Sequence, residues 1–70
     1  INLNQIKVNF QNEDNITFNE SDGLKIIWKD KWVHIRKSNT EPIIRIISEA
    51  NEHTTAKDLI DSIKYIVNKF

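Results

Sequence analysis

The sequence predicts an α+β domain in which an antiparallel sheet of about four strands packs against helices in two layers. Apolar and polar residues alternate over 24–36, a β-branched run follows at 43–48, and the C-terminal segment has apolar residues at spacings of three and four. We treat residues 1–70 as a single domain, because domains are rarely shorter than about 50 residues. The chain contains no cysteine, so neither a disulfide nor a thiolate metal site stabilises it.

Residues 1–20 are the least defined part of the sequence. Ile6, Val8 and Phe10 alternate as in a strand, whereas Leu3, Ile6 and Phe10 fit one face of a short helix. Periodicity does not separate these alternatives, and we favour the helix.

Two alternating segments, residues 24–28 and 32–36, predict a pair of neighbouring strands. The polar residues 29–31 between them form a connection short enough for a hairpin. Residues 43–48, with the sequence IIRIIS, are rich in β-branched side chains and predict a central strand.

The C-terminal segment predicts an amphipathic helix. Thr54 or Thr55 can cap it, and Asp58 then falls in the first turn, where the helix dipole favours negative charge. The predicted apolar stripe consists of Ala56, Leu59, Ile60, Ile63, Ile66, Val67 and Phe70. This stripe should cover one face of the sheet.

Charge and hydropathy exclude several classes of function. The formal net charge is zero, which argues against a general nucleic-acid or anionic-membrane binder. No apolar run approaches the roughly 20 residues of a transmembrane helix. The chain begins with isoleucine and without a signal segment, which suggests a fragment of a longer protein and, without cysteine, a cytoplasmic one.

Anion-binding groups are concentrated between the last two predicted strands, in the sequence RKSNTEPIIR. A tight connection would bring Arg36 and Arg45 to the same end of the sheet, and an arginine fork matches phosphate oxygens. Ser38 and Thr40 add hydroxyl donors, and successive backbone N–H groups in such a turn can form an anion-binding concavity. Asn39 tolerates a positive φ and suits the apex of the connection.

Two further residues of this connection have structural interpretations. Pro42 fixes its own φ and stiffens the exit, while Glu41 would repel a phosphate and is better suited to orienting Arg36 or Arg45. The alternative is an ordinary solvated turn with surface ion pairs worth about 0–1 kcal/mol. The residue types alone leave both interpretations open.

The segment RKSNTEPIIRIISEA resembles the signature of the last domain of the α-D-phosphohexomutase superfamily, which includes phosphoglucomutase, phosphomannomutase and phosphoglucosamine mutase. The matching positions are Arg36, Ser38, Asn39, Thr40, Glu41, Pro42, Arg45, Glu49 and Ala50. The upstream segment DGLKIIWKDKWVHIRK also resembles the superfamily, in which an Asp-Gly pair opens the hairpin that leads into the motif. Residues 1–20 carry no recognisable match.

The resemblance implies a TATA-box-binding-protein-like fold and a role as the C-terminal, phosphate-binding domain of a larger four-domain mutase. Such enzymes interconvert hexose 1-phosphate and hexose 6-phosphate through a bisphosphorylated sugar. The implied phosphate-binding residues are Arg36, Ser38, Asn39, Thr40 and Arg45. The implied supporting residues are Glu41, Pro42 and Glu49, with Glu49 as a structural partner for an arginine.

The resemblance also implies what this chain lacks. We find no phosphoserine loop, no aspartate-rich Mg²⁺ loop and no sugar-recognition loop, so the isolated chain should be inactive and bind no cofactor, with Mg²⁺ needed in the parent enzyme. The expected partners are a phosphosugar and the other three domains, with no nucleic acid and no membrane. Asn39 in place of glycine favours the phosphoglucomutase/phosphomannomutase type, and phosphoglucosamine mutase is the alternative.

Histidines and tryptophans outside the motif have structural interpretations first. His34 should be a partly buried strand residue and His53 a solvated turn residue, and no ligand spacing predicts a zinc site. Trp28 and Trp32 flank the hairpin turn and favour cross-strand aromatic packing. A rival class, an RNA- or protein-binding module on the sheet surface, lacks the glycine- and aromatic-rich RNP signature.

Overall fold

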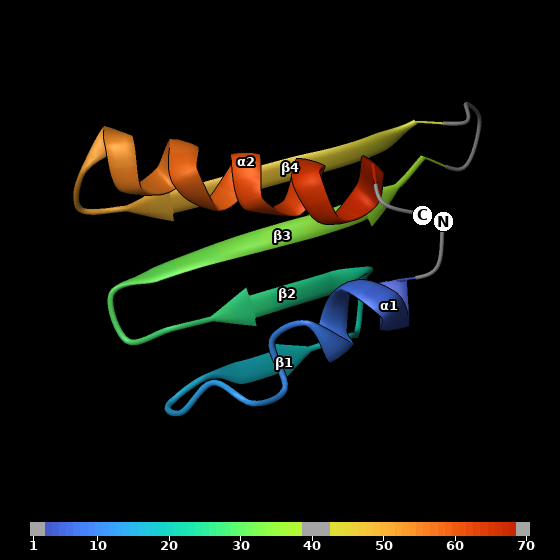
Figure 1. The fold of residues 1–70 in the computed structure, drawn as a ribbon, viewed down its shortest axis with the longest axis horizontal. Helices are drawn as coiled ribbons and strands as arrows, with labels where there is room; N and C mark the ends of the chain where they lie inside the picture. Colours follow the sequence, from blue (N-terminus) through green and yellow to red (C-terminus); the bar gives the residue numbers. More distant parts are fainter. Residues whose placement is uncertain (1–2, 39–42, 69–70) are drawn as a thin grey trace.

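Four antiparallel strands and two helices make up the residues that the computed structural model describes, which are 3–38 and 43–68. The elements are α1 (Leu3–Val8), β1 (Thr17–Asn19), β2 (Leu24–Ile27), β3 (Lys31–Lys37), β4 (Ile44–Ala50) and α2 (His53–Asn68). The strands lie in the order β1-β2-β3-β4, and both helices lie against the same side of the sheet (Figure 1). The predicted α+β fold class is confirmed.

Alternation along the strands gives the sheet two different faces. The register pairs Leu24 with Ile35 and Ile26 with Val33, and all four side chains are at most 1% exposed. These residues belong to the face under the helices, which we call the covered face. Neighbouring residues point to the opposite side, because side chains alternate along a strand. We call this side the open face, and its members on β2, β3 and β4 are Lys25, Ile27, Trp32, His34, Arg36, Arg45, Ile47 and Glu49.

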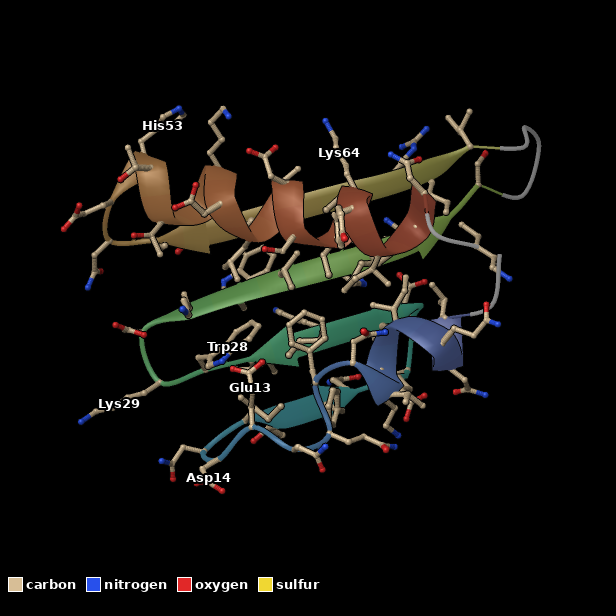
Figure 2. The ribbon with its side chains drawn as sticks, in the orientation of Figure 1. Glu13, Asp14, Trp28, Lys29, His53 and Lys64 are labelled. Atoms are coloured by element: carbon tan, nitrogen blue, oxygen red, sulfur yellow. The ribbon has the colours of Figure 1, made fainter. Side chains whose placement is uncertain are left out.

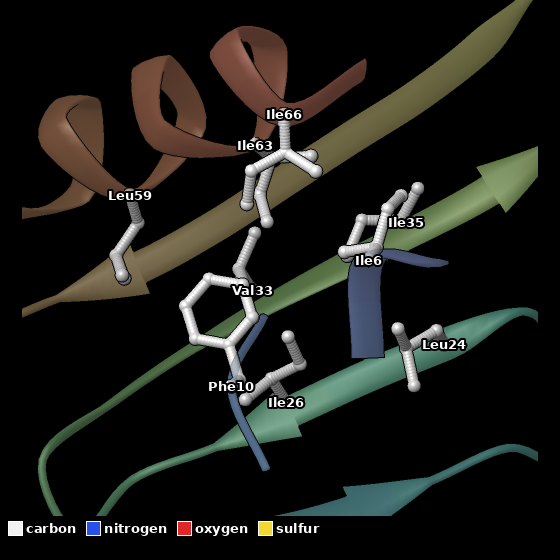
Figure 3. Close-up of a cluster of buried hydrophobic side chains, with 9 residues drawn as sticks. All are labelled: Ile6, Phe10, Leu24, Ile26, Val33, Ile35, Leu59, Ile63 and Ile66. Carbon is white, nitrogen blue, oxygen red and sulfur yellow. The ribbon is translucent and has the colours of Figure 1, made fainter. Parts of the chain in front are cut away.

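The hydrophobic core lies between the covered face and the helices (Figure 3). Helix α2 contributes its apolar stripe, with Leu59, Ile63 and Ile66 buried, as predicted. Ile6 of α1 is fully buried, and Phe10 closes the core beside it. A small two-layer core of this kind holds the sheet at a fixed shape while its other face stays accessible.

The N-terminal region contains one element of each kind. The helix that we favoured is present as α1, with Ile6 buried and Val8 59% exposed, which is contrary to a strand alternation through Ile6, Val8 and Phe10. Residues 17–19 form the short edge strand β1, in which Phe18 lies opposite Ile26 and packs against the core.

Two predictions, the position of β4 in the sheet and the start of α2, were wrong. The β-branched strand β4 is an edge strand rather than a central one, because it pairs only with β3 and draws its burial from α2. Helix α2 begins at His53, so neither threonine is the cap and no acidic residue lies in its first turn. The Ala56 N–H donates to Glu52 O at 3.2 Å, which closes the first helical turn earlier than the sequence suggested.

The predicted cross-strand packing of the two tryptophans is not found. Trp28 packs edge-on against Phe10, with ring centroids 5.9 Å apart, and its indole Nε1–H donates to Glu13 Oε1 at 3.5 Å (Figure 2). Trp32 lies on the open face, where the Lys25 ammonium sits 4.3 Å from its ring centroid. The turn between the strands is tight, since the Trp28 N–H donates to Lys31 O at 2.8 Å, and it directs the rings to opposite faces.

Candidate functional site

The pairing of β3 with β4 brings the two arginines of the motif together. Arg36 lies directly opposite Arg45 in the register, on the open face at the end of both strands. One residue beyond β3, the Ser38 N–H donates to Ile43 O at 3.1 Å, so the strands remain joined up to the connection. The structure therefore confirms that both arginines reach the same end of the sheet.

A hollow of about 180 Å³ lies at this end and is lined by Arg36, Lys37, Ser38 and Arg45. Three of these side chains are cationic and none is acidic. Like charges on directly opposite residues destabilise a sheet, so the arginine pair has a cost that an anion between them would relieve. Arginine and serine offer donors that converge on such an anion.

The connection between β1 and β2 supports Arg36 from the side. Asp22 Oδ2 lies 3.2 Å from Arg36 Nε, and Asp22 O lies 2.6 Å from His34 Nε2. A carbonyl oxygen only accepts, so the His34 ring donates in this bond. The start of β2 and the end of β3 lie at the same end of the sheet (Figure 1).

Gly23 allows this close approach. It has a φ of +71°, and a side chain there would collide with the Ile35 carbonyl oxygen and lie 3.2 Å from the Arg36 Cα. Only glycine accepts both demands without strain. The Asp-Gly pair was predicted only as the start of a hairpin, and its contact with Arg36 was not predicted. The register of the hairpin could have indicated this contact. Leu24 pairs with Ile35, so the residues just before Leu24 lie next to Arg36.

The other residues predicted for the site either lie outside the described residues or lie away from the hollow. Asn39, Thr40, Glu41 and Pro42 lie outside the described residues. Glu49 does not join the site, because it lies opposite Trp32 towards the far end of β4. It is four positions along β4 from Arg45, a distance of about 13 Å, and its role as a structural partner for an arginine stays a prediction. Among the described residues, Asp22 provides a carboxylate that contacts Arg36.

Another hollow in the described part of the chain is lined by acidic residues. A wider hollow of about 570 Å³ lies between Phe10 and α2, but Asp58 and Asp61 line it and do not suit an anion. Within residues 3–38 and 43–68, no three acidic, histidine or cysteine side chains gather to hold a metal ion. Neither described helix is long and apolar enough to cross a membrane. Fold and site together define a small α+β domain whose sheet ends in a cationic hollow.

Comparison with known proteins identifies the family. Residues 2–65 match the family described as "Phosphoglucomutase/phosphomannomutase, C-terminal domain". The chain belongs to this family, the last domain of the phosphohexomutases, which confirms the resemblance seen in the motif.

Curated relatives carry the names of several mutases. A phosphoglucosamine/phosphogalactosamine mutase of Sulfurisphaera tokodaii is 54% identical over 46 residues, which is 66% of this chain and 10% of that protein. A phosphomannomutase of Methanocaldococcus jannaschii is 40% identical over 50 residues, 71% of this chain and 11% of that protein. A phosphoglucomutase/phosphomannomutase of Thermococcus kodakarensis is 51% identical over 41 residues, 59% of this chain and 9% of that protein. The aligned part of the chain is thus only about a tenth of each relative's length.

Proposed function

We propose that this chain is the substrate-phosphate-binding domain of a phosphohexomutase that interconverts hexose 1-phosphate and hexose 6-phosphate through a bisphosphorylated sugar. One observation carries the proposal: Arg36, Lys37, Ser38 and Arg45 line a single hollow at the end of the sheet. Family membership supplies the reaction class, since the relatives are named as mutases of phosphorylated sugars.

The proposed role is to hold the phosphate that is not reacting. The guanidinium groups of Arg36 and Arg45 would approach it from two opposed strands, and Ser38 would add a hydroxyl donor. Asn39 and Thr40 belong to the same proposed set. Energy from binding a remote part of a substrate positions its reacting end, which lowers the barrier at the distant reaction centre.

Chemistry at the reacting phosphate would come from elsewhere in a longer parent enzyme. We expect the isolated chain to be inactive and the parent, a cytoplasmic enzyme of four domains, to supply the phosphoserine, the Mg²⁺ site and the sugar-recognition loop. In that enzyme this domain would close over the substrate as a lid.

The sugar is the finer part of the proposal. Asn39 favours a phosphoglucomutase/phosphomannomutase type, and the names of the Thermococcus kodakarensis and Methanocaldococcus jannaschii relatives belong to that type. Phosphoglucosamine mutase is the alternative, since the Sulfurisphaera tokodaii relative is named for amino sugars. Parallel assays of the parent enzyme with glucose, mannose and glucosamine phosphates would separate the two types.

Arg36→Ala in the full-length mutase tests the phosphate role. We expect kcat/KM for the hexose 1-phosphate to fall at least about 10-fold, because a charge-assisted hydrogen bond to a charged group is worth about 1.5–3 kcal/mol. Lys29→Ala is the matched control, since it removes one positive charge from the exposed turn at the far end of β3 and should leave kcat/KM unchanged. Full efficiency in the Arg36→Ala enzyme would refute the role assigned to this residue.

A further inference from the structure

The residue that contacts Arg36 from outside the motif is Asp22, and its backbone is fixed from two sides. The His34 ring donates to the Asp22 carbonyl oxygen at 2.6 Å. The next residue, Gly23, lies so close to β3 that a side chain there would collide with the Ile35 carbonyl oxygen. The Asp22 carboxylate is therefore presented to Arg36 from a constrained backbone, while both side chains stay accessible to solvent, with Arg36 46% and Asp22 63% exposed.

The contact uses one particular atom of the arginine. Asp22 Oδ2 lies 3.2 Å from Arg36 Nε, and Arg36 also lines the cationic hollow. A guanidinium has five N–H donors in a fixed fork, of which Nε carries one and the two terminal nitrogens carry four. The ion pair places a carboxylate beside the Nε edge of the guanidinium, and this attraction favours one orientation of the plane while the terminal nitrogens reach further from the backbone.

We infer that Asp22 is a positioning residue for substrate phosphate: it holds the Arg36 guanidinium in its binding orientation before the sugar phosphate arrives. This inference rests on the proposed function, because the anion in the hollow is taken to be the phosphate of the substrate. The physical benefit is preorganisation, since a long side chain that is already ordered loses less entropy when it binds.

Positioning and simple electrostatics predict opposite changes in phosphate affinity when the Asp22 carboxylate is removed. A carboxylate next to an anion site repels the anion, so its removal should strengthen phosphate binding if charge alone matters. Its removal should weaken phosphate binding if the carboxylate orders Arg36. The direction of the change in affinity therefore separates the two accounts.

The experiment compares variants of the 70-residue chain by NMR, with glucose 1-phosphate as the probe and ionic strength held constant. Asp22→Ala removes the carboxylate, and Asp22→Asn keeps the shape of the side chain but removes its charge. Asp30→Ala is the matched control, because it removes the same charge from an exposed position in the turn at the other end of the β2–β3 hairpin. The Nε–Hε signal of Arg36 reports side-chain order without ligand, and backbone amide shifts report affinity and folding.

We expect Asp22→Ala to weaken glucose 1-phosphate binding about three- to tenfold, the effect of leaving one long side chain to be ordered on binding. Its Arg36 Nε–Hε signal should show faster solvent exchange than in the unmodified chain. The affinity of Asp22→Asn for glucose 1-phosphate should fall between those of Asp22→Ala and the unmodified chain. The affinity of Asp30→Ala should match that of the unmodified chain. If Asp22→Ala does not fold, the Asp22→Asn variant provides the same comparison.

Unchanged or tighter binding in the Asp22 variants would overturn the inference. A failure of the unmodified chain to bind glucose 1-phosphate would count instead against the phosphate site as an autonomous one. In that case the Arg36 Nε–Hε signal still decides the positioning role, because equal exchange in the unmodified and Asp22→Ala chains would refute it.

Discussion

The two faces of strand β3 differ in what they contribute, although they share one backbone. Val33 and Ile35 are fully buried under the helices, whereas Arg36, the very next residue, is exposed on the open face. Burial of apolar surface stabilises the fold, and donors left accessible at the end of the same strand are available to an anion. Alternation along one strand can therefore separate folding from binding.

The separation is incomplete at Gly23. The backbone there packs against Ile35, which belongs to the covered face, and against the Cα of Arg36, which belongs to the open face. A change at this glycine should therefore affect both stability and binding, whereas a change to one side chain of β3 should affect only one of them.

The largest expected effect is on the covered face. Ile35→Ala should lower the free energy of unfolding by about 2–5 kcal/mol, because it opens a cavity in a fully packed position. Ile47→Ala is the matched control: the same substitution at a 48% exposed position of the neighbouring strand should cost within about 0.5 kcal/mol. Urea unfolding followed by circular dichroism measures both, and similar losses would contradict the division between the faces.

An intermediate effect is expected at the junction of the two faces. Gly23→Ala should destabilise the chain by about 1–3 kcal/mol, since a residue with a side chain is strained at a positive φ and the new methyl group meets the Ile35 carbonyl oxygen. Amide shifts of Arg36 should move as well. Unchanged stability and an unchanged Arg36 amide signal in this variant would show that the close approach of Gly23 to β3 affects neither stability nor the site.

The smallest expected effect concerns a pair far from the site. The carboxylate of Asp61, which accepts a hydrogen bond from Lys57 Nζ at 3.0 Å, raises the pKa of Lys57 above its ordinary value of 10.5. A raised pKa in the folded state stabilises the fold below the unfolded pKa, and this contribution is lost as the pH rises through the folded value. Asp61→Asn should return the Lys57 pKa towards its ordinary value, measured by an NMR pH titration, with no change in glucose 1-phosphate binding.

Local patterns in the sequence predicted much of this molecule. The apolar stripe of α2, the hairpin and the convergence of Arg36 with Arg45 all depend on residues that are close in sequence or joined by a short connection. The edge strand β1 could not be predicted, because three residues are too few to show a period.

Features that depend on the order of strands also escaped the sequence analysis. A β-branched run indicates a strand but not its neighbours, so β4 was taken for a central strand. The contact of Asp22 with Arg36 joins residues whose proximity depends on the register of β2 with β3. Glu49 was given a supporting role by resemblance, and its place opposite Trp32 also depends on the register of β3 with β4.

An amide NMR titration of the 70-residue chain with glucose 1-phosphate, against chloride at equal ionic strength, tests the central claim most directly. The account predicts saturable shifts confined to residues 22–23 and 36–45, with a dissociation constant of about 1 mM, or about −4 kcal/mol. Shifts no larger than those with chloride, or shifts spread over the covered face, would contradict a phosphate site at the end of the sheet.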